Sequence, residues 1–132
     1  MSRSTVVQDA SFLKCQSITH SDALIEVYQN FEIRRFFTVT VEQSAIRGNH
    51  AHLKCNQLIL VIYGEIQFEI YDGKNFIQFL LTPSSGILHV PPGLWTVQKY
   101  LGKSQMIVMC DQVFDDNDYI RDWIYFVTYK NV

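Results

Sequence analysis

The stretch Gln57–Leu81, QLILVIYGEIQFEIYDGKNFIQFLL, decides the fold class of this chain. It opens with a nearly continuous apolar run that ends at Gly64, where a turn is expected. It continues with strict alternation, in which one face carries Ile66, Phe68 and Ile70. Asp72-Gly73 then predicts a hairpin turn, because both residues tolerate positive φ. The segment therefore predicts three short antiparallel strands in succession.

Strand patterns of the same kind lie on both sides of this stretch, separated by turn signals such as Pro91-Pro92-Gly93. The pattern lacks the strand–helix alternation of a parallel sheet. It predicts one all-β domain over residues 1–132, an antiparallel jelly-roll sandwich or barrel. The tail Asp115–Phe126 begins with acidic residues, which predict a short helical turn near Tyr119-Ile120. The other predicted strands are Ile33–Val41, Arg47–Lys54, Ile87–Val90, Thr96–Tyr100 and Gln105–Cys110.

Composition excludes several classes of partner and compartment. The 132 residues carry a formal net charge of −2, which gives no reason to expect nucleic acid or an anionic membrane as partner. Three cysteines without a Cys-x-x-Cys pair indicate reduced thiols. Residues 1–13 lack the pattern of a signal peptide, and no apolar run is long enough to span a membrane. We expect a cytoplasmic protein.

The pair His50-Ala51-His52 is the main functional signal, since the chain has four histidines in all. Side chains two residues apart on a strand share a face, so both imidazoles are expected to point to one spot. Such a pair can hold a metal, move protons or fill a core. A structural role is the usual interpretation of a lone histidine, but the flanking Arg47 and Gly48 and the downstream spacing favour a functional role for this pair.

The metal interpretation rests on spacing. Metal-binding cupins have a carboxylate at the position of Gln57 and a further histidine at the position of Thr96, and here an amide and a hydroxyl replace them. A neutral amide oxygen is a poor cation ligand, so the sequence predicts no metal. Proton transfer fits better, because imidazole titrates near neutrality. Arg47 suits a phosphate, and Gln57 suits a hydroxyl or an imidazole.

From about Phe31 to Phe126 the chain resembles the sugar 3,4-ketoisomerases that act on dTDP-4-keto-6-deoxyglucose, a WxcM-like group of the cupin superfamily. The resemblance rests on five segments of the sequence: Ile33-Arg34-Arg35, Arg47-Gly48-x-His50-Ala51-His52, Gln57 with Gly64, Pro92-Gly93-Leu94-Trp95, and Asp118-Tyr119-Ile120-Arg121-Asp122. It implies a homodimer without cofactor that converts a 4-keto to a 3-keto sugar in deoxyamino sugar biosynthesis. It implies His50 as the base that shuttles the proton between C3 and C4, and His52 as its partner. The substrate-binding residues that we expect are Arg47, Asn49, Gln57, Trp95, Tyr119 and Arg121.

The chain departs from this family at three places. The family tyrosine after Ile-x-Arg is replaced by Phe36-Phe37-Thr38, and a family His-Glu pair after Trp95 by Thr96-Val97. An N-terminal Arg-Gly-Ser-Leu-like element is replaced by residues 21–24, Ser-Asp-Ala-Leu. Thr38 and Tyr63 are candidate sources of the missing hydroxyl. A non-catalytic cupin that binds a sugar nucleotide, and a metal-dependent cupin enzyme, are the competing hypotheses.

Overall fold

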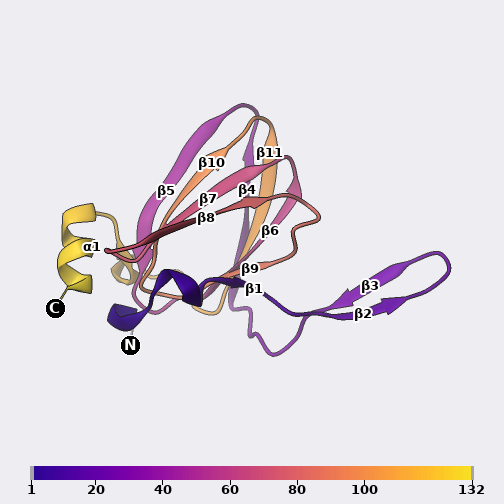
Figure 1. Ribbon diagram of the computed structural model, residues 1–132, viewed down its shortest axis with the longest axis horizontal. Coiled ribbons are helices and arrows are strands. Elements are labelled where there is room, and N and C mark those ends of the chain that lie inside the picture. The colour runs from indigo at the N-terminus through magenta and orange to yellow at the C-terminus, as the bar shows by residue number, and fades with distance from the viewer. Residues whose placement is uncertain (1, 132) are drawn as a thin grey trace.

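Two five-stranded antiparallel sheets face each other in the computed structural model, which describes residues 2–131 (Figure 1). The first sheet has the order β1-β9-β6-β11-β4, formed by Ser11–Phe12, Leu88–Val90, Gln57–Tyr63, Ser104–Cys110 and Arg35–Val41. The second has the order β12-β5-β10-β7-β8, formed by Tyr119–Ile120, Ala45–His52, Trp95–Tyr100, Ile66–Tyr71 and Phe76–Leu81. The predicted jelly-roll class is confirmed.

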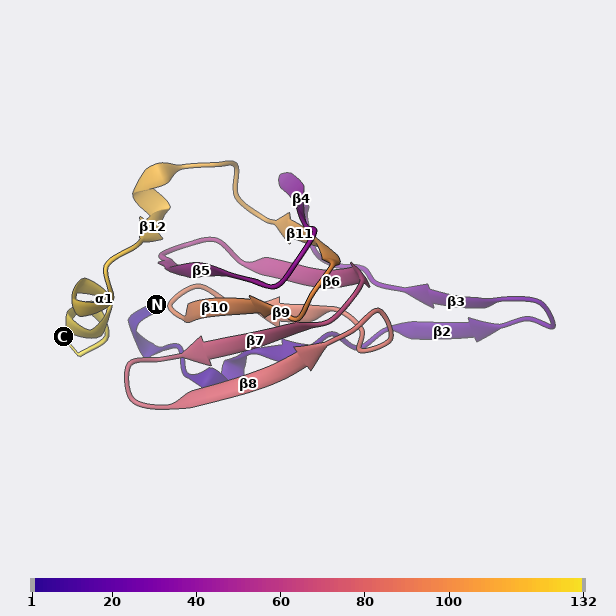
Figure 2. The ribbon, with the colours of Figure 1, turned by 90° about the horizontal axis from the view of Figure 1, so that it is seen from above.

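The remaining elements lie at the edges of the sandwich. The hairpin β2–β3, formed by Gln16–Thr19 and Leu24–Val27, extends away from the two sheets (Figure 2). The helix α1, Trp123–Lys130, covers one end of the second sheet (Figure 1). Three short 3-10 turns, η1, η2 and η3, comprise Ser2–Ser4, Val7–Asp9 and Asp116–Asp118. No helix in residues 2–131 is long and apolar enough to cross a membrane.

The C-terminal segment differs from its prediction in detail. The helical turn lies at Asp116–Asp118, where the Asp115 carboxylate accepts a hydrogen bond from the Asn117 backbone N–H. Tyr119-Ile120, where the turn was expected, is the short strand β12, and Tyr119 pairs with His52 of β5. This segment pairs with the free edge of β5, and this tertiary pairing overrides the local preference for a helical turn. The predicted short C-terminal helix is present as α1, which begins at Trp123, later in the chain than expected.

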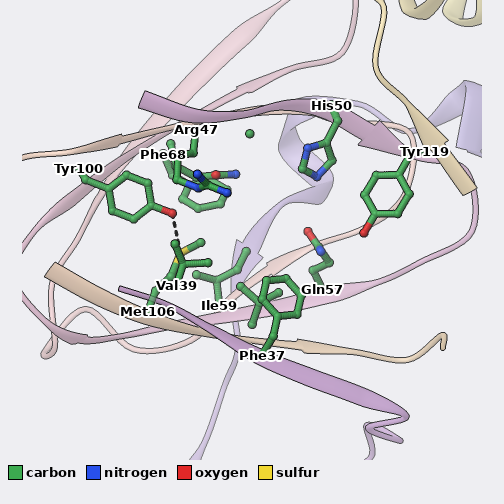
Figure 3. A pocket seen from close by; sticks show the side chains of 13 residues that line it. Phe37, Val39, Arg47, His50, Gln57, Ile59, Phe68, Tyr100, Met106 and Tyr119 are labelled. Atoms are coloured by element: carbon green, nitrogen blue, oxygen red, sulfur yellow. Dashed lines mark hydrogen bonds between the residues drawn. The ribbon is translucent and has the colours of Figure 1, made fainter. Parts of the chain in front are cut away.

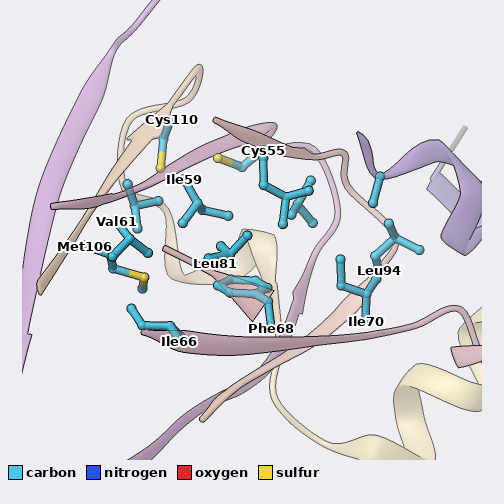
Figure 4. Packing of buried hydrophobic residues seen from close by; sticks show 14 of the residues in the cluster. Cys55, Ile59, Val61, Ile66, Phe68, Ile70, Leu81, Leu94, Met106 and Cys110 are labelled. Carbon is cyan, nitrogen blue, oxygen red and sulfur yellow. The ribbon is translucent and has the colours of Figure 1, made fainter. Parts of the chain in front are cut away.

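The core lies between the sheets and follows the predicted alternation. Ile66, Phe68 and Ile70 of β7 are buried there with apolar residues of β6 and β11 (Figure 4). A second cluster lies on the outer face of the second sheet, beneath α1, and comprises Ala51, Trp95, Ile120 and Phe126. The predicted turn at Asp72-Gly73 is present, since Gly73 has a φ of 94° and Asp72 accepts from the backbone N–H groups of Lys74 and Asn75.

Candidate active site

A cavity of about 100 Å³ lies between the two sheets (Figure 3). Apolar side chains of β4, β6, β7 and β11 form one part of its wall, including Phe37, Ile59 and Phe68. The polar side chains that line it are Arg47, His50, Gln57, Gln98, Tyr100 and Tyr119. A few polar groups on an apolar wall are the usual composition of a small-molecule site.

A β-bulge in β5 brings Arg47 and His50 to this cavity together. His50 pairs with Thr96 and Gly48 with Val97, so Asn49 has no partner on β10. Gly48 and Asn49 have φ values of 93° and 59°, the left-handed conformation that such a bulge needs. Strict alternation would place Arg47 on the face opposite His50, and the extra residue reverses this relation.

Three of the expected substrate-binding residues, Asn49, Trp95 and Arg121, lie outside the cavity. Asn49, the unpaired residue of the bulge, and Trp95 line a separate shallow groove with Tyr71, Val97 and Trp123. This groove is on the outer face of the second sheet, where Trp95 is also packed against Phe126 at 5.6 Å between ring centroids. The structure therefore does not bring the side chains of Asn49 and Trp95 to His50.

The imidazole of His50 faces the cavity and is held in a fixed environment. Its ring centroid lies 5.1 Å from that of His52 and 5.2 Å from that of Tyr119. Burial and the neighbouring His52 lower the pKa of His50 to about 4, although a hydrogen bond to the Gly48 backbone opposes the shift. At neutral pH the ring is therefore uncharged and has a lone pair with which it can accept a proton.

His52 lies behind His50 and is bound to a carboxylate that the sequence prediction had not singled out. Its Nδ1 atom is 2.8 Å from Asp118 Oδ2, and both side chains are nearly fully buried. Burial opposes ionisation of Asp118, but hydrogen bonds from His52 and the Lys54 backbone N–H hold the pKa of Asp118 below its usual value. Asp118 thus fixes the ring orientation of His52, whose Nε2 atom is buried and has no partner within residues 2–131.

Tyr119 reaches the cavity from β12 and packs on both histidines. Its ring centroid lies 4.4 Å from that of His52, its cross-strand partner. Arg121 lies over the Tyr119 ring, with its guanidinium carbon 4.2 Å from the ring centroid. Arg121 does not line the cavity itself, and it forms an ion pair with Asp116 at 3.1 Å. The cation–π contact holds the phenol at the rim of the cavity.

Gln57 lines the inner end of the cavity beside a pair of cysteines. Its Nε2 atom lies 3.8 Å from Cys110 Sγ, which Arg35 also contacts at 3.5 Å. A hydrogen bond with Cys55, together with Arg35 and Gln57, lowers the pKa of Cys110 to about 6, although burial opposes this shift. The same contact with Cys110, with burial, raises the pKa of the Cys55 thiol.

The donor set does not fit a metal ion. Within residues 2–131, His52, Cys55 and Asp118 are the residues whose ligand atoms cluster, all within 4.8 Å. His52 and Asp118 are hydrogen-bonded to each other, and the raised pKa of Cys55 disfavours the thiolate that a metal would bind. At the cupin ligand positions Gln57 and Thr96 offer no charged donor.

Neither candidate for the missing hydroxyl lies in the cavity. Thr38 is on the outer face of β4, and Tyr63 is partly exposed at the end of β6. Phe37, the residue before Thr38 on β4, does line the cavity but has no hydroxyl. The phenols that line it are Tyr100 and Tyr119. Tyr100 has no sequence signal for this role, whereas Tyr119, Asp118 and Arg35 all lie in segments that carry the family resemblance.

A jelly roll with a histidine-lined cavity defines the chain as a cupin-type protein. The family model described as WxcM-like, C-terminal (FdtA) matches residues 11–131, so the chain belongs to this family. A curated relative, the TDP-4-oxo-6-deoxy-alpha-D-glucose-3,4-oxoisomerase of Aneurinibacillus thermoaerophilus, is 28% identical over 114 residues, which are 81% of each chain.

Solved structures agree with this assignment. WlaRA, a TDP-fucose-3,4-ketoisomerase from Campylobacter jejuni, superimposes with a TM-score of 0.83 at 25% identity, covering 93% of this chain and 96% of that one. The sugar 3,4-ketoisomerase QdtA from Thermoanaerobacterium thermosaccharolyticum, solved in complex with TDP, also gives 0.83, at 19% identity over 95% of this chain and 96% of that one. At this lower identity the likeness to QdtA supports the fold alone.

Proposed function

We propose that this chain is a sugar 3,4-ketoisomerase, which converts a TDP-linked 4-keto-6-deoxyhexose to its 3-keto isomer without a metal. The observation that carries the proposal is the uncharged imidazole of His50 in the cavity of a chain that belongs to the WxcM-like family. The activities of the Aneurinibacillus relative and of WlaRA support the same reaction.

His50 takes the proton from C3 of the sugar and returns it to C4. A proton next to a ketone is acidic enough for imidazole when the enolate oxygen receives a hydrogen bond. A pKa of about 4 keeps His50 in the base form at neutral pH. His52, oriented by Asp118, packs edge-on against the His50 ring and holds it in place.

The size of the cavity limits what enters it. About 100 Å³ is less than the roughly 300–1,000 Å³ of typical small-molecule pockets. We therefore expect the keto-sugar ring to enter, near Gln57 and Gln98, and the nucleotide to remain at the rim. Arg47 at one side and Arg121 at the other are the cations available there for the diphosphate.

The test is a proton-exchange experiment. The protein is incubated with TDP-4-keto-6-deoxyglucose in deuterium oxide, and the sugar ring is followed by NMR. We expect incorporation of deuterium at a carbon of the sugar ring and formation of a 3-keto product. His50→Asn should abolish turnover and leave substrate affinity within a few-fold, and His20→Asn, at an exposed histidine, is the matched control.

Binding of the nucleotide sugar without exchange would identify a non-catalytic binding protein instead. Loss of activity with a chelator, restored by a divalent metal, would support a metal-dependent enzyme.

The proposal extends to assembly and location. A two-stranded hairpin is marginally stable alone in water, yet β2–β3 extends from the body with Ile18, Leu24 and Ile25 exposed (Figure 1). We therefore propose a homodimer, in which a second copy covers this hairpin. The cysteines, Cys15, Cys55 and Cys110, are free thiols, which supports a reducing cytoplasm as the site of action.

A further inference from the structure

Arg35 places a cation behind the wall of the cavity. The side chain extends inward from β4, opposite Cys110 of β11 in the sheet register. Its Nη1 and Nη2 atoms lie 3.4 and 3.5 Å from the phenolic oxygen of Tyr119. Its Nε atom is buried without a hydrogen-bond partner within residues 2–131. Since unsatisfied buried donors are uncommon, such an arrangement calls for a functional explanation.

The phenolic oxygen of Tyr119 receives its hydrogen bonds from a cation. Both contacts from Arg35 are donated to the phenolic oxygen, so the hydroxyl hydrogen is left free to point into the cavity. The ring contacts both His52 and Arg121, and these contacts limit rotation of the side chain. The other cavity phenol, Tyr100, lies at the far end and donates to Met106 Sδ (Figure 3). Tyr119 is therefore the phenol that shares its part of the cavity with His50.

We propose that Tyr119 is a second catalytic residue, which carries the proton between the two sugar oxygens, and that Arg35 is the residue that positions it and stabilises its phenolate. This inference rests on the proposed function. An isomerisation of this type moves two protons: one from C3 to C4 and another from the C3 hydroxyl to the C4 oxygen. His50 transfers the proton between the two carbons, and a second group is required to transfer the proton between the two oxygens.

The steps balance with these two residues. In the first half, His50 accepts the C3 proton, the electrons of that bond form a C3–C4 double bond, and the C4 oxygen takes the Tyr119 proton. The enediol now lies between an imidazolium and a phenolate, whose charge the Arg35 guanidinium offsets. In the second half, the phenolate takes the proton of the C3 hydroxyl, C3 becomes the ketone, and the imidazolium returns its proton to C4. Both residues end as they began.

The first test removes the hydroxyl and keeps the ring. Tyr119→Phe should lower kcat by roughly 10²–10⁴-fold, the usual size of a general acid–base contribution, with KM within a few-fold of the wild type. Tyr63→Phe, at the end of β6 and outside the cavity, is the matched control and should keep full activity. Arg35→Met should move the pH profile of kcat to higher pH, because the phenolate loses its cation.

A second test separates proton transfer from packing. Replacement of Tyr119 by 3,5-difluorotyrosine retains the shape of the side chain but makes the phenol a stronger acid. We expect the pH profile of kcat to move to lower pH, while the same replacement at Tyr63 leaves it in place. A Tyr119→Phe variant with kcat within threefold of wild type, or an unmoved profile with the fluorinated residue, would overturn the inference. Failure of the wild-type protein to exchange deuterium would instead refute the proposed function.

Discussion

At the scale of single residues, His50 links catalysis to stability. Its pKa is about 4 in the folded protein, against 6.5 for the free side chain, so the unfolded chain binds more protons between these values. Stability therefore falls as the pH falls from 6.5 toward 4. The two pKa values imply a loss of about 2 kcal/mol between pH 7 and pH 5 from this residue alone. Urea titrations at both pH values check it: His50→Asn should lose less stability than the wild type, and His20→Asn should follow the wild type. An equal loss in all three proteins would contradict the assignment.

Asp118 acts at the same scale, through the tautomer of His52. Its carboxylate accepts a hydrogen bond from Nδ1 at 2.8 Å, which makes Nδ1 the donor nitrogen on this side of the ring. Asp118→Asn presents an amide that can reverse this tautomer, and we expect kcat to fall roughly 10²-fold or more with little change in KM. The ¹⁵N shifts of the His52 ring report the tautomer directly. Asp111→Asn is the control, because Asp111 also accepts a backbone N–H, from Asn56, but forms no hydrogen bond with His50 or His52. If neither the ¹⁵N shifts of the His52 ring nor kcat changed in this variant, Asp118 would have no role in the active site.

At the scale of the element, the bulge in β5 determines which side chains share the cavity. A Cβ atom on Gly48 would lie 2.8 Å from Gln98 Nε2 and 2.9 Å from the Thr96 carbonyl oxygen, at a φ of 93°. Gly48→Ala should therefore cost about 1–3 kcal/mol of unfolding free energy and lower kcat, because the backbone that positions His50 must shift. Gly102→Ala has the same backbone strain, at a φ of 106°, without a neighbour within 4 Å. Denaturant titration and kinetics of both variants separate the steric contact from the backbone strain. Equal losses of stability and of kcat in the two variants would contradict a role of the bulge in positioning His50.

The same bulge shows where sequence reasoning stops at this scale. Period-two alternation correctly placed His50 and His52 on one face. It located β4 to β11 to within about two residues, but it missed β1, β2 and β3. Alternation alone predicts that the side chains of Arg47 and Asn49 share one face of β5. In the structure they lie on opposite faces, because the unpaired Asn49 switches every preceding residue of the strand to the other face. Gly48-Asn49 was the available signal, since both residues favour positive φ. In α1 no amphipathic pattern exists to be read, because Trp123, Ile124 and Tyr125 are all partly or largely exposed.

At the scale of the whole molecule, the site assembles contacts that no local pattern contains. Asp118 and Tyr119 meet His52 across a separation of more than sixty residues, and Arg35 meets Tyr119 across 84. Pairing of β12 with the edge of β5 brings these groups together, and the sequence predicted a helical turn at that position. The motif resemblance nevertheless marked all of these segments. Such a motif indicates which residues matter, and only the fold shows which of them contact one another.

Assembly is the last prediction at this scale. Ile18 and Ile25 are cross-strand partners in the exposed hairpin, so one face of β2–β3 carries an uncovered apolar pair. The exposed residues Ile33, Phe36, Val113 and Phe114 form a patch on the body that can receive such a hairpin. We expect the wild type to sediment at twice the chain mass of 15.4 kDa, and Ile18→Asp with Ile25→Asp to sediment at the monomer mass. Leu101→Asp, in the exposed loop between β10 and β11, is the control and should remain dimeric. A wild type that sediments as a monomer at all concentrations would contradict the dimer, and a dimeric double variant would place the interface elsewhere.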